Sequence, residues 1–263
     1  MTGAPFLLFF DLHAWLATAA LGFARLAPVF FMLPFFNNGV LTGPTRVAVI
    51  ILISMSLWPV SDAAWPALDS VAMLGLILQE ALIGLVIGGL LCWPIWVMQG
   101  LGSLIDNQRG ATLGNTIDPA NGVDTSELSN FLQWFAAAVF LEAGGMQVVV
   151  ETFSTSYQLC PPQTGCELAL EPVLRWLDPL LGKVLVISAP VVVTLLLSEA
   201  LLGLLGRFAP QMNAFSVSLT IKSAIALLVL LLYFGSHLPD EVVRMGGAAQ
   251  SNIGQWLQPS MDH

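Results

Sequence analysis

The sequence predicts an all-α, membrane-associated protein of about six long hydrophobic helices, and three observations lead to that prediction. Of its 263 residues 56% are hydrophobic and only 10% are charged, whereas a soluble domain carries about 25% charged residues. The apolar residues gather in six blocks, most of them long enough to cross or nearly cross a hydrocarbon core of about 30 Å. Most links between the blocks are short, so neighbouring helices are expected to form hairpins.

The blocks follow one another along the chain. They are residues 15–36, 47–60, 71–99, 131–150, 180–205 and 217–234. The second block is short for a membrane span unless it continues back through Arg46 and Thr45. Four prolines inside the blocks or near their ends predict kinks or breaks, because proline removes a backbone donor. These are Pro28, Pro34, Pro94 and Pro190. A short helix is expected near 168–177, within the long link that follows the fourth block.

Charge and motif content exclude several classes of function. The formal net charge is −9, from 8 Lys plus Arg against 17 Asp plus Glu, and without clustered cations we expect no nucleic-acid partner. The three histidines show no metal-ligand spacing, and no HExxH, phosphate-binding or GxSxG motif occurs, so we predict no enzyme, metal or cofactor. Cys160 and Cys166 flank a Pro-Pro-Gln-Thr-Gly turn and either pair in an oxidising compartment or stay free.

Nearly every apolar block carries an ionisable residue within it or at its edge. These residues are Arg25, Arg46, Glu80, Glu142, Lys183, Glu199 and Lys222. A charge at the centre of a lipid-facing helix costs about 2.5 to 3.5 kcal/mol on insertion scales. The charges are therefore expected to pair inside the bundle or to be covered by other subunits. For Arg25 and Lys183, near block ends, reaching the membrane interface is an alternative.

Two local segments nearly repeat each other. One runs from Glu80 to Gly84 as Glu-Ala-Leu-Ile-Gly, and the other from Glu199 to Gly203 as Glu-Ala-Leu-Leu-Gly. Residues four apart share a helix face, so each glutamate lies one turn before a glycine that permits close approach of another helix. Gly88 extends the first copy to a GxxxG motif. These segments are interpreted as helix-crossing sites, with an ion relay as the alternative.

Residues 102–127 form a long polar insert between two apolar blocks. Loops of that length are uncommon and are either functional or disordered. This one is not low in complexity and keeps four apolar residues, which favours a shaped loop; they are Leu104, Ile105, Leu113 and Ile117. Asp106 and Arg109 are three apart and are able to pair. The alternative is an ordinary inter-helix link with turns at its Asp-Pro and Asn-Gly steps.

The residues of this insert and its flanks resemble the T subunit of the bacterial type III secretion export apparatus, which is related to the flagellar export protein FliR. The insert and the residues just before it contribute Gln99, Gly102, Asp106 and the triplet Gln108-Arg109-Gly110. Upstream lie Arg25, Pro34, Pro44, Arg46, Glu80 and Gly84; downstream lie Arg207, Pro210, Gln211, Asn213, Phe215 and Lys222. Gln-Arg-Gly stands where flagellar members more often have Gln-Met-Gly, which favours the injectisome branch.

The resemblance implies a fold, an assembly and a location. One T subunit would pack with several R and S subunits in a helical export gate of the bacterial inner membrane, within the secretion-system basal body. Residues 1–179 would be R-like, 180–236 an S-like hairpin, and 237–263 a polar tail that matches nothing recognised. Further partners would be the U-type switch subunit, basal-body and needle or inner-rod components, the lipid membrane, and secreted proteins as cargo.

In that family the loop after the third long helix points into the channel and helps to close it. Carried onto this sequence, the plug is roughly 104–123. Its site residues are Gly102, Asp106, Gln108, Arg109, Gly110, Gly114 and Asp118. Two rival functions are kept. One is a small-molecule or ion transporter that uses Glu80, Glu142 and Glu199, and the other is a structural membrane anchor.

Overall fold

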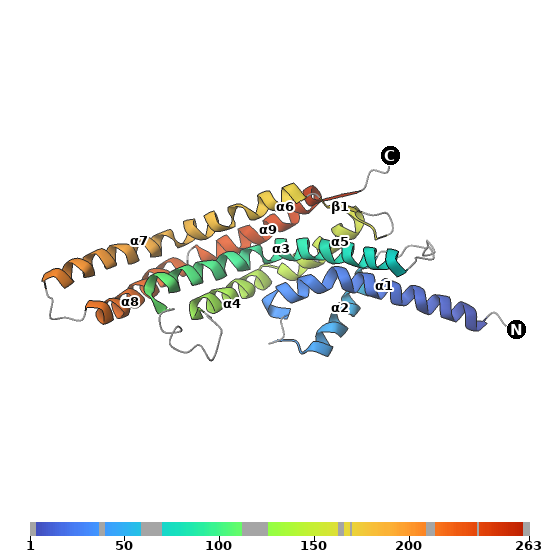
Figure 1. Ribbon diagram of the computed structural model, residues 1–263, viewed down its shortest axis with the longest axis horizontal. Coiled ribbons are helices and arrows are strands. Elements are labelled where there is room, and N and C mark those ends of the chain that lie inside the picture. Colours follow the sequence, from blue (N-terminus) through green and yellow to red (C-terminus); the bar gives the residue numbers. More distant parts are fainter. Residues whose placement is uncertain are drawn as a thin grey trace. The chain divides into compact units, whose positions relative to one another are not determined.

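The computed structural model describes residues 4–36, 40–58, 70–111, 126–162, 166–168, 170–208, 214–235 and 237–259. Side chains are described between Trp15 and Gly247, apart from 70, 166–168, 170, 172 and 214–216 within those ranges. Almost all of these residues are helical (Figure 1). The elements in order are α1 Ala4–Met32, the 3₁₀ turn η1 Pro34–Phe36, α2 Gly43–Leu57, α3 Ser70–Arg109, α4 Glu127–Glu142, α5 Gly145–Leu159, β1 Cys166–Leu168, α6 Leu170–Leu177, α7 Pro179–Phe208, α8 Ala214–Phe234, α9 Leu238–Trp256 and β2 Leu257–Pro259.

The chain forms two compact units, neither of which is continuous in sequence. Unit 1 comprises residues 1–92, 144–175 and 246–263, and unit 2 comprises 93–143 and 176–245. The long helix α3 therefore supplies its first part to one unit and its last part to the other. The predicted division into R-like and S-like parts concerns likeness to other subunits, so it stays a prediction.

Unit 1 is built around α1, the first part of α3, and α5. Its core holds large apolar side chains that are fully or almost fully buried. They include Leu21, Leu26 and Phe30 of α1, Ile83 and Ile87 of α3, and Phe153 of α5. The short strands β1 and β2 pair antiparallel, with Glu167 opposite Gln258. Cys160 is disulfide-bonded and Cys92 is a buried free thiol. Of the two alternatives left open by the sequence for Cys160, the bonded one is present; the Cys166 side chain lies outside the described residues.

Unit 2 is built around the end of α3, α4, and the hairpin of α7 and α8. The two hairpin helices lie side by side (Figure 1). Buried side chains come from every helix, among them Val97 and Leu101 of α3, Leu132 of α4, Val191 and Leu195 of α7, Ala226 of α8 and Val242 of α9. Lys183 near the start of α7 pairs with Glu241 of α9. Much of the predicted polar tail, residues 237–263, is therefore the helix α9.

Four of the six predicted blocks are single long helices, and two differ. The second block is α2, which begins at Gly43 with Pro44 in its first turn, a position that suits proline because the first-turn N–H groups have no helical partner. Its 15 residues are fewer than the roughly 20 that a span needs. The fourth block, expected as one helix, is two helices bent by 74°. The prediction failed because Gly144 takes φ +85°, a left-handed conformation that ends α4.

The prolines do not break the long helices. Pro28, Pro94 and Pro190 lie inside α1, α3 and α7, which continue on both sides. Pro34 lies just beyond α1 and begins η1. Thus the predicted interruption occurs only at Pro34, where the helix has already ended.

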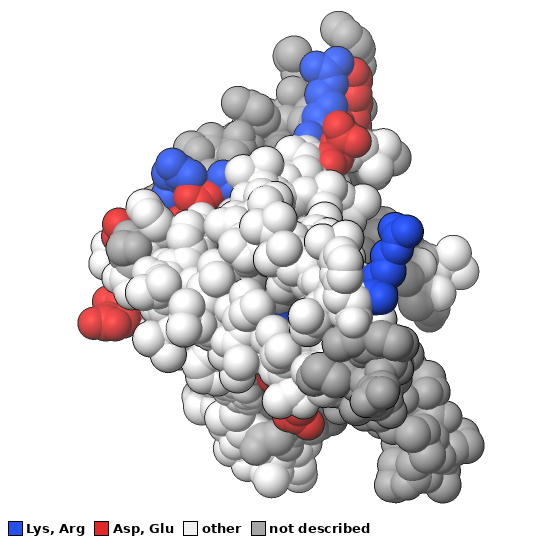
Figure 2. Space-filling model, turned by 90° about the vertical axis from the view of Figure 1, so that its left-hand side faces the viewer, with Lys and Arg blue, Asp and Glu red and all other residues white. Residues whose placement is uncertain are grey.

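Several of the described helices have the length and apolarity of membrane spans. Four qualify, within 15–32, 71–109, 173–208 and 217–234, and the bent pair α4 and α5 is a fifth candidate. Charged side chains appear as isolated groups on a surface of uncharged residues (Figure 2). An all-α membrane protein, as predicted, is confirmed.

Candidate functional site

A buried carboxylate joins the end of α3 to the start of α4. Asp106 is 1% exposed. Its Oδ2 accepts hydrogen bonds from Ser126 Oγ and from the Leu128 backbone N–H at 3.1 Å. Its Oδ1 accepts from Arg109 Nε at 2.7 Å. One side chain thus binds both the last turn of α3 and the first turn of α4.

Serines and a glycine complete this junction. Ser126 caps α4, because its Oγ accepts from the Ser129 backbone N–H at 3.0 Å. Ser129 Oγ donates to the Gln99 carbonyl at 2.8 Å, and Ser103 Oγ donates to Ser129 Oγ at 3.1 Å. At Gly102, an added Cβ would lie 2.4 Å from Ser129 Cα. Only glycine lets the two helices approach this closely.

We call this junction the loop base, and it corrects the predicted start of the polar loop. It consists of Gln99, Gly102, Ser103, Asp106, Arg109, Ser126, Leu128 and Ser129. Residues 102–109 were expected in the loop but form the last turns of α3, because their polar side chains bond to α4 while Leu101 and Ile105 continue the buried face. The helix ends at Gly110, which has φ +78°. Gly114 and Asp118 lie outside the described residues.

Asp106 and Arg109 pair as predicted, but in different surroundings. The sequence placed them in a flexible loop open to water, where such a bond is modest. Both instead lie on α3, and their side chains are only 1% and 17% exposed. Gln108, also expected in the loop, is a partly buried residue of the same helical turn.

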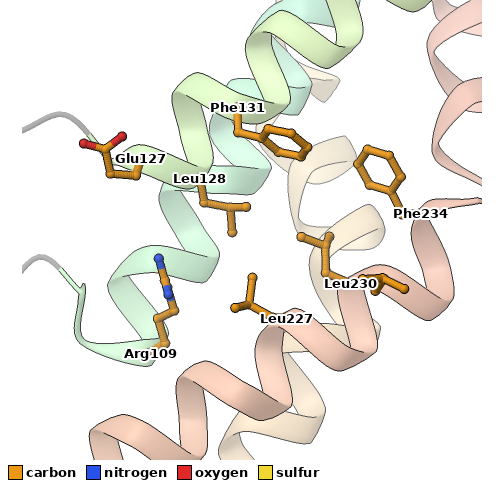
Figure 3. Close-up of a pocket in the computed structure, with 8 residues that line it drawn as sticks. Arg109, Glu127, Leu128, Phe131, Leu227, Leu230 and Phe234 are labelled. Carbon is orange, nitrogen blue, oxygen red and sulfur yellow. The ribbon is translucent and has the colours of Figure 1, made fainter.

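An apolar pocket of about 570 Å³ lies next to the loop base. Arg109 and Glu127 stand at one side of it, and leucines and phenylalanines of α4 and α8 line the rest (Figure 3). Phe131 faces Phe234, with ring centroids 5.9 Å apart, and Phe135 contacts the same ring at 4.2 Å. The start of α4 is therefore tied to α3 by polar bonds and to α8 by aromatic contacts.

A second polar cluster lies in unit 1 and centres on Arg25, which is completely buried. Its Nε and Nη2 donate to the two carboxylate oxygens of Glu80, the latter at 2.8 Å. Nη2 also donates to the Cys160 carbonyl at 2.9 Å, and Nη1 donates to Ser156 Oγ at 3.3 Å. The guanidinium lies 4.2 Å from the ring centroid of Tyr157. The cluster joins α1, α3 and α5, so Arg25 does not reach out to the interface.

The glycines of the first repeat lie against α1. A Cβ added at Gly84 would be 2.0 Å from the Arg25 carbonyl oxygen, and one at Gly88 would be 2.6 Å from Met32 Sδ. The predicted close crossing at this motif is present, and Arg25 supplies both the crossing backbone and the partner of Glu80.

The remaining predicted charges have separate environments. Lys222 Nζ lies 3.0 Å from Glu199 Oε2. Arg46 is buried, with its guanidinium 4.0 Å from the ring centroid of Phe31. Glu142 and Arg207 are exposed, and neither has a salt bridge to another described residue. Pro210, Gln211 and Asn213 lie outside the described residues, as does the side chain of Phe215.

Sequence reasoning missed several residues of both clusters. Ser126, Ser129, Ser156 and Tyr157 were not predicted as site residues. Ser126 could have been found, because a serine directly before an apolar helical run is a typical N-cap. The other three bond to residues at least 26 positions away in sequence, and no local pattern indicates such contacts.

We predict that Asp106→Ala lowers the free energy of unfolding by about 1–3 kcal/mol, since the buried Leu128 N–H loses its acceptor. The neighbouring Asn107 is exposed, so Asn107→Ala is a matched control that should shift stability by less than about 0.5 kcal/mol. Thermal unfolding in detergent, followed by tryptophan fluorescence, measures both. Equal midpoints for the two variants would show that the loop base does not hold the helices together.

Membrane-length apolar helices, paired buried charges and a bonded junction between two of the helices define an all-α membrane protein. The chain belongs to the bacterial export proteins, family 1, whose family model matches residues 16–242.

Individual relatives agree with this assignment. The chain is 53% identical over 250 residues to the surface presentation of antigens protein SpaR of Salmonella typhimurium, covering 95% of each chain. It is 28% identical to the Yop proteins translocation protein T of Yersinia pestis, covering 83% of this chain and 86% of that one. It is 27% identical to the flagellar biosynthetic protein FliR of Bacillus subtilis, covering 80% and 83%.

These matches confirm the resemblance to the T-subunit family and its injectisome branch, because identity to SpaR is about twice that to the flagellar protein. The chain is thus a component of a type III secretion export apparatus. It is a membrane protein of the bacterial inner membrane, in the basal body of that apparatus.

Proposed function

We propose that this chain is a core subunit of the export gate, that it forms part of the protein-conducting channel, and that residues 112–125 help to close that channel. The observation that carries the proposal is the loop base. Residues 112–125 lie outside the described ones, but on either side of them Asp106 bonds to Arg109 at the end of α3 and to Ser126 at the start of α4. These bonds hold the two flanking helices together, and a segment that blocks a channel must be held at a defined place.

The proposed partners are the R and S subunits, with which the T subunit would form a helical gate. Further partners would be the U-type switch subunit and the basal-body and needle or inner-rod components, with secreted proteins as cargo. Support comes from the C-terminal hairpin, where the apolar windows of α7 and α8 are only 28% and 17% buried by this chain. That much open apolar surface fits helices that pack on other subunits as well as on lipid.

The arrangement of the carboxylates does not favour the transporter alternative. A relay needs groups that exchange protons with a substrate route. Glu80 is instead held by both of its oxygens on Arg25, and Glu142 is exposed at the end of α4. These two residues therefore offer no shared pathway.

We expect deletion of residues 113–122 to leave assembly intact and to make the inner membrane leaky to small solutes. The loop base lies entirely outside the deleted residues, so the helices should still pack. Uptake of a small impermeant dye by cells that carry the deletion measures the leak, and co-purification of unlike membrane subunits measures assembly.

The experiment needs one control and has one outcome that would contradict the proposal. Deletion in cells that lack the proposed partner subunits should cause no leak, because the channel would not form. An assembled deletion variant whose membrane stays impermeable would contradict the closing role.

A further inference from the structure

The two copies of the Glu-Ala-Leu-(Ile/Leu)-Gly repeat have different surroundings. In the first copy, the α1 backbone at Arg25 lies against Gly84, and the Arg25 side chain reaches back one turn to both oxygens of Glu80. Arg25 therefore provides both the backbone that packs on Gly84 and the cation that pairs with Glu80. In the first copy, this short sequence thus packs against a helix that carries a basic residue.

In the second copy no described part of this chain fills the corresponding space. A Cβ added at Gly203 would meet nothing within 4 Å. The Glu199 side chain is 58% exposed although Lys222 lies 3.0 Å from its Oε2. Oε1 has no hydrogen bond to any described residue. One oxygen of the carboxylate is thus paired with Lys222, and the other faces outward.

The surface around Glu199 is otherwise apolar. Leu196, Leu197, Leu201 and Leu204 are each more than half exposed. A carboxylate that projects from such a surface towards hydrocarbon is costly, whereas a charge-assisted hydrogen bond from a basic side chain satisfies it. The apolar rim fits a hydrophobic helix, and the carboxylate fits a cation on that helix.

We infer that Glu199 and Gly203 form a helix-crossing site for an unlike subunit, whose apolar helix places an Arg or Lys backbone against Gly203 and its cationic group on Glu199. The inference deepens the proposed function and rests on it. The second copy has Arg207 where the first has Gly88, so the close approach extends over one turn only. The contact between subunits would then resemble the crossing of α1 and α3 at Glu80 and Gly84 within this chain.

Glycine substitutions in the full chain, expressed with the whole secretion apparatus, test the crossing. Gly203→Leu should lower recovery of unlike subunits with the tagged chain roughly tenfold, because overpacking destabilises a close helix crossing. Gly182 lies on the same helix and is equally open, so Gly182→Leu should change recovery less than about twofold. The amount of chain in the membrane should be unchanged in both variants, since a Cβ at either position meets nothing within 4 Å.

A photo-crosslinking residue at Leu204 identifies the occupant, with Leu181, which is 72% exposed, as the control position. The expected adduct is a peptide from an apolar helix of a different protein, with Arg or Lys within one turn of the crosslink. An adduct with lipid alone, with a second copy of this chain, or with a helix that lacks a basic residue would overturn the inference.

A charge exchange separates this inference from the proposed function. Glu199→Arg should abolish recovery of the crosslinked subunit, and replacement of that subunit's basic residue by Glu should restore it. If the unsubstituted chain brings down no unlike subunit, the proposed function fails and the inference fails with it. If it does and Gly203→Leu recovers the same amount, only the inference fails.

Discussion

Glu80→Ala is expected to lower the free energy of unfolding by about 3–5 kcal/mol, because it leaves Arg25 charged and buried without its carboxylate. Arg25 is fully buried and Glu80 is only 2% exposed. The remaining acceptors, Ser156 Oγ and the Cys160 carbonyl, are neutral and do not balance the charge. Thermal unfolding of the purified chain in detergent measures the effect. Recovery of the complex should fall as well, since less folded chain is available.

Two further variants isolate the ion pair. Arg25→Met combined with Glu80→Leu should recover most of the lost stability, because well-packed apolar residues often replace a buried pair without loss. Glu171 and Arg175 also pair, but their side chains are 75% and 79% exposed, so Glu171→Ala should cost less than about 1 kcal/mol. A Glu80→Ala variant as stable as Glu171→Ala would show that the Arg25 cluster does not stabilise unit 1.

Gly84→Ala is expected to have an effect of similar size, of about 3 kcal/mol, because even one methyl group overpacks this crossing. The obstacle is the Arg25 carbonyl oxygen, 2.0 Å from the added Cβ, and backbone cannot move aside as a flexible side chain can. Separation of α1 from α3 would also draw Arg25 away from Glu80. The same unfolding measurement applies.

Gly75→Ala is the matched control on the same helix. Nothing lies within 4 Å of a Cβ at Gly75, so alanine should stabilise the chain by up to about 1 kcal/mol through its better helix propensity. Opposite signs at the two glycines are the expected result. Equal effects would mean that the α1–α3 crossing is looser than the structure describes.

The long apolar helices could be predicted from sequence because each block is mostly apolar and carries few charges. The exceptions depend on single backbone positions. Gly144 is one of two adjacent glycines in an apolar run, and such a pair is common inside membrane helices. Whether it continues the helix or turns it depends on what each side packs against, which a local pattern does not contain.

The start of the polar loop was predicted incorrectly, and residues 112–125 lie outside the described residues. Polarity between 102 and 109 resembles a loop when the partner of each side chain is unknown. Once Ser126 and the Leu128 N–H supply those partners, the same residues are a helical turn with a buried carboxylate. The expected pairing of Asp106 with Arg109 was independent of this error, since three residues of separation suit both a turn and a helix.

By itself, the sequence determined that this protein is an all-α membrane protein and that it carries the residues of the T-subunit family. Both properties follow from composition and from short segments that are read directly along the chain. Only the tertiary structure decided what those segments do. Two nearly identical repeats, at Glu80 and at Glu199, differ because α1 crosses one and no described part of this chain crosses the other. The junction of α3 and α4, in the same way, depends on bonds from Asp106 to Ser126 and to the Leu128 N–H, which lie about 20 residues further along the chain.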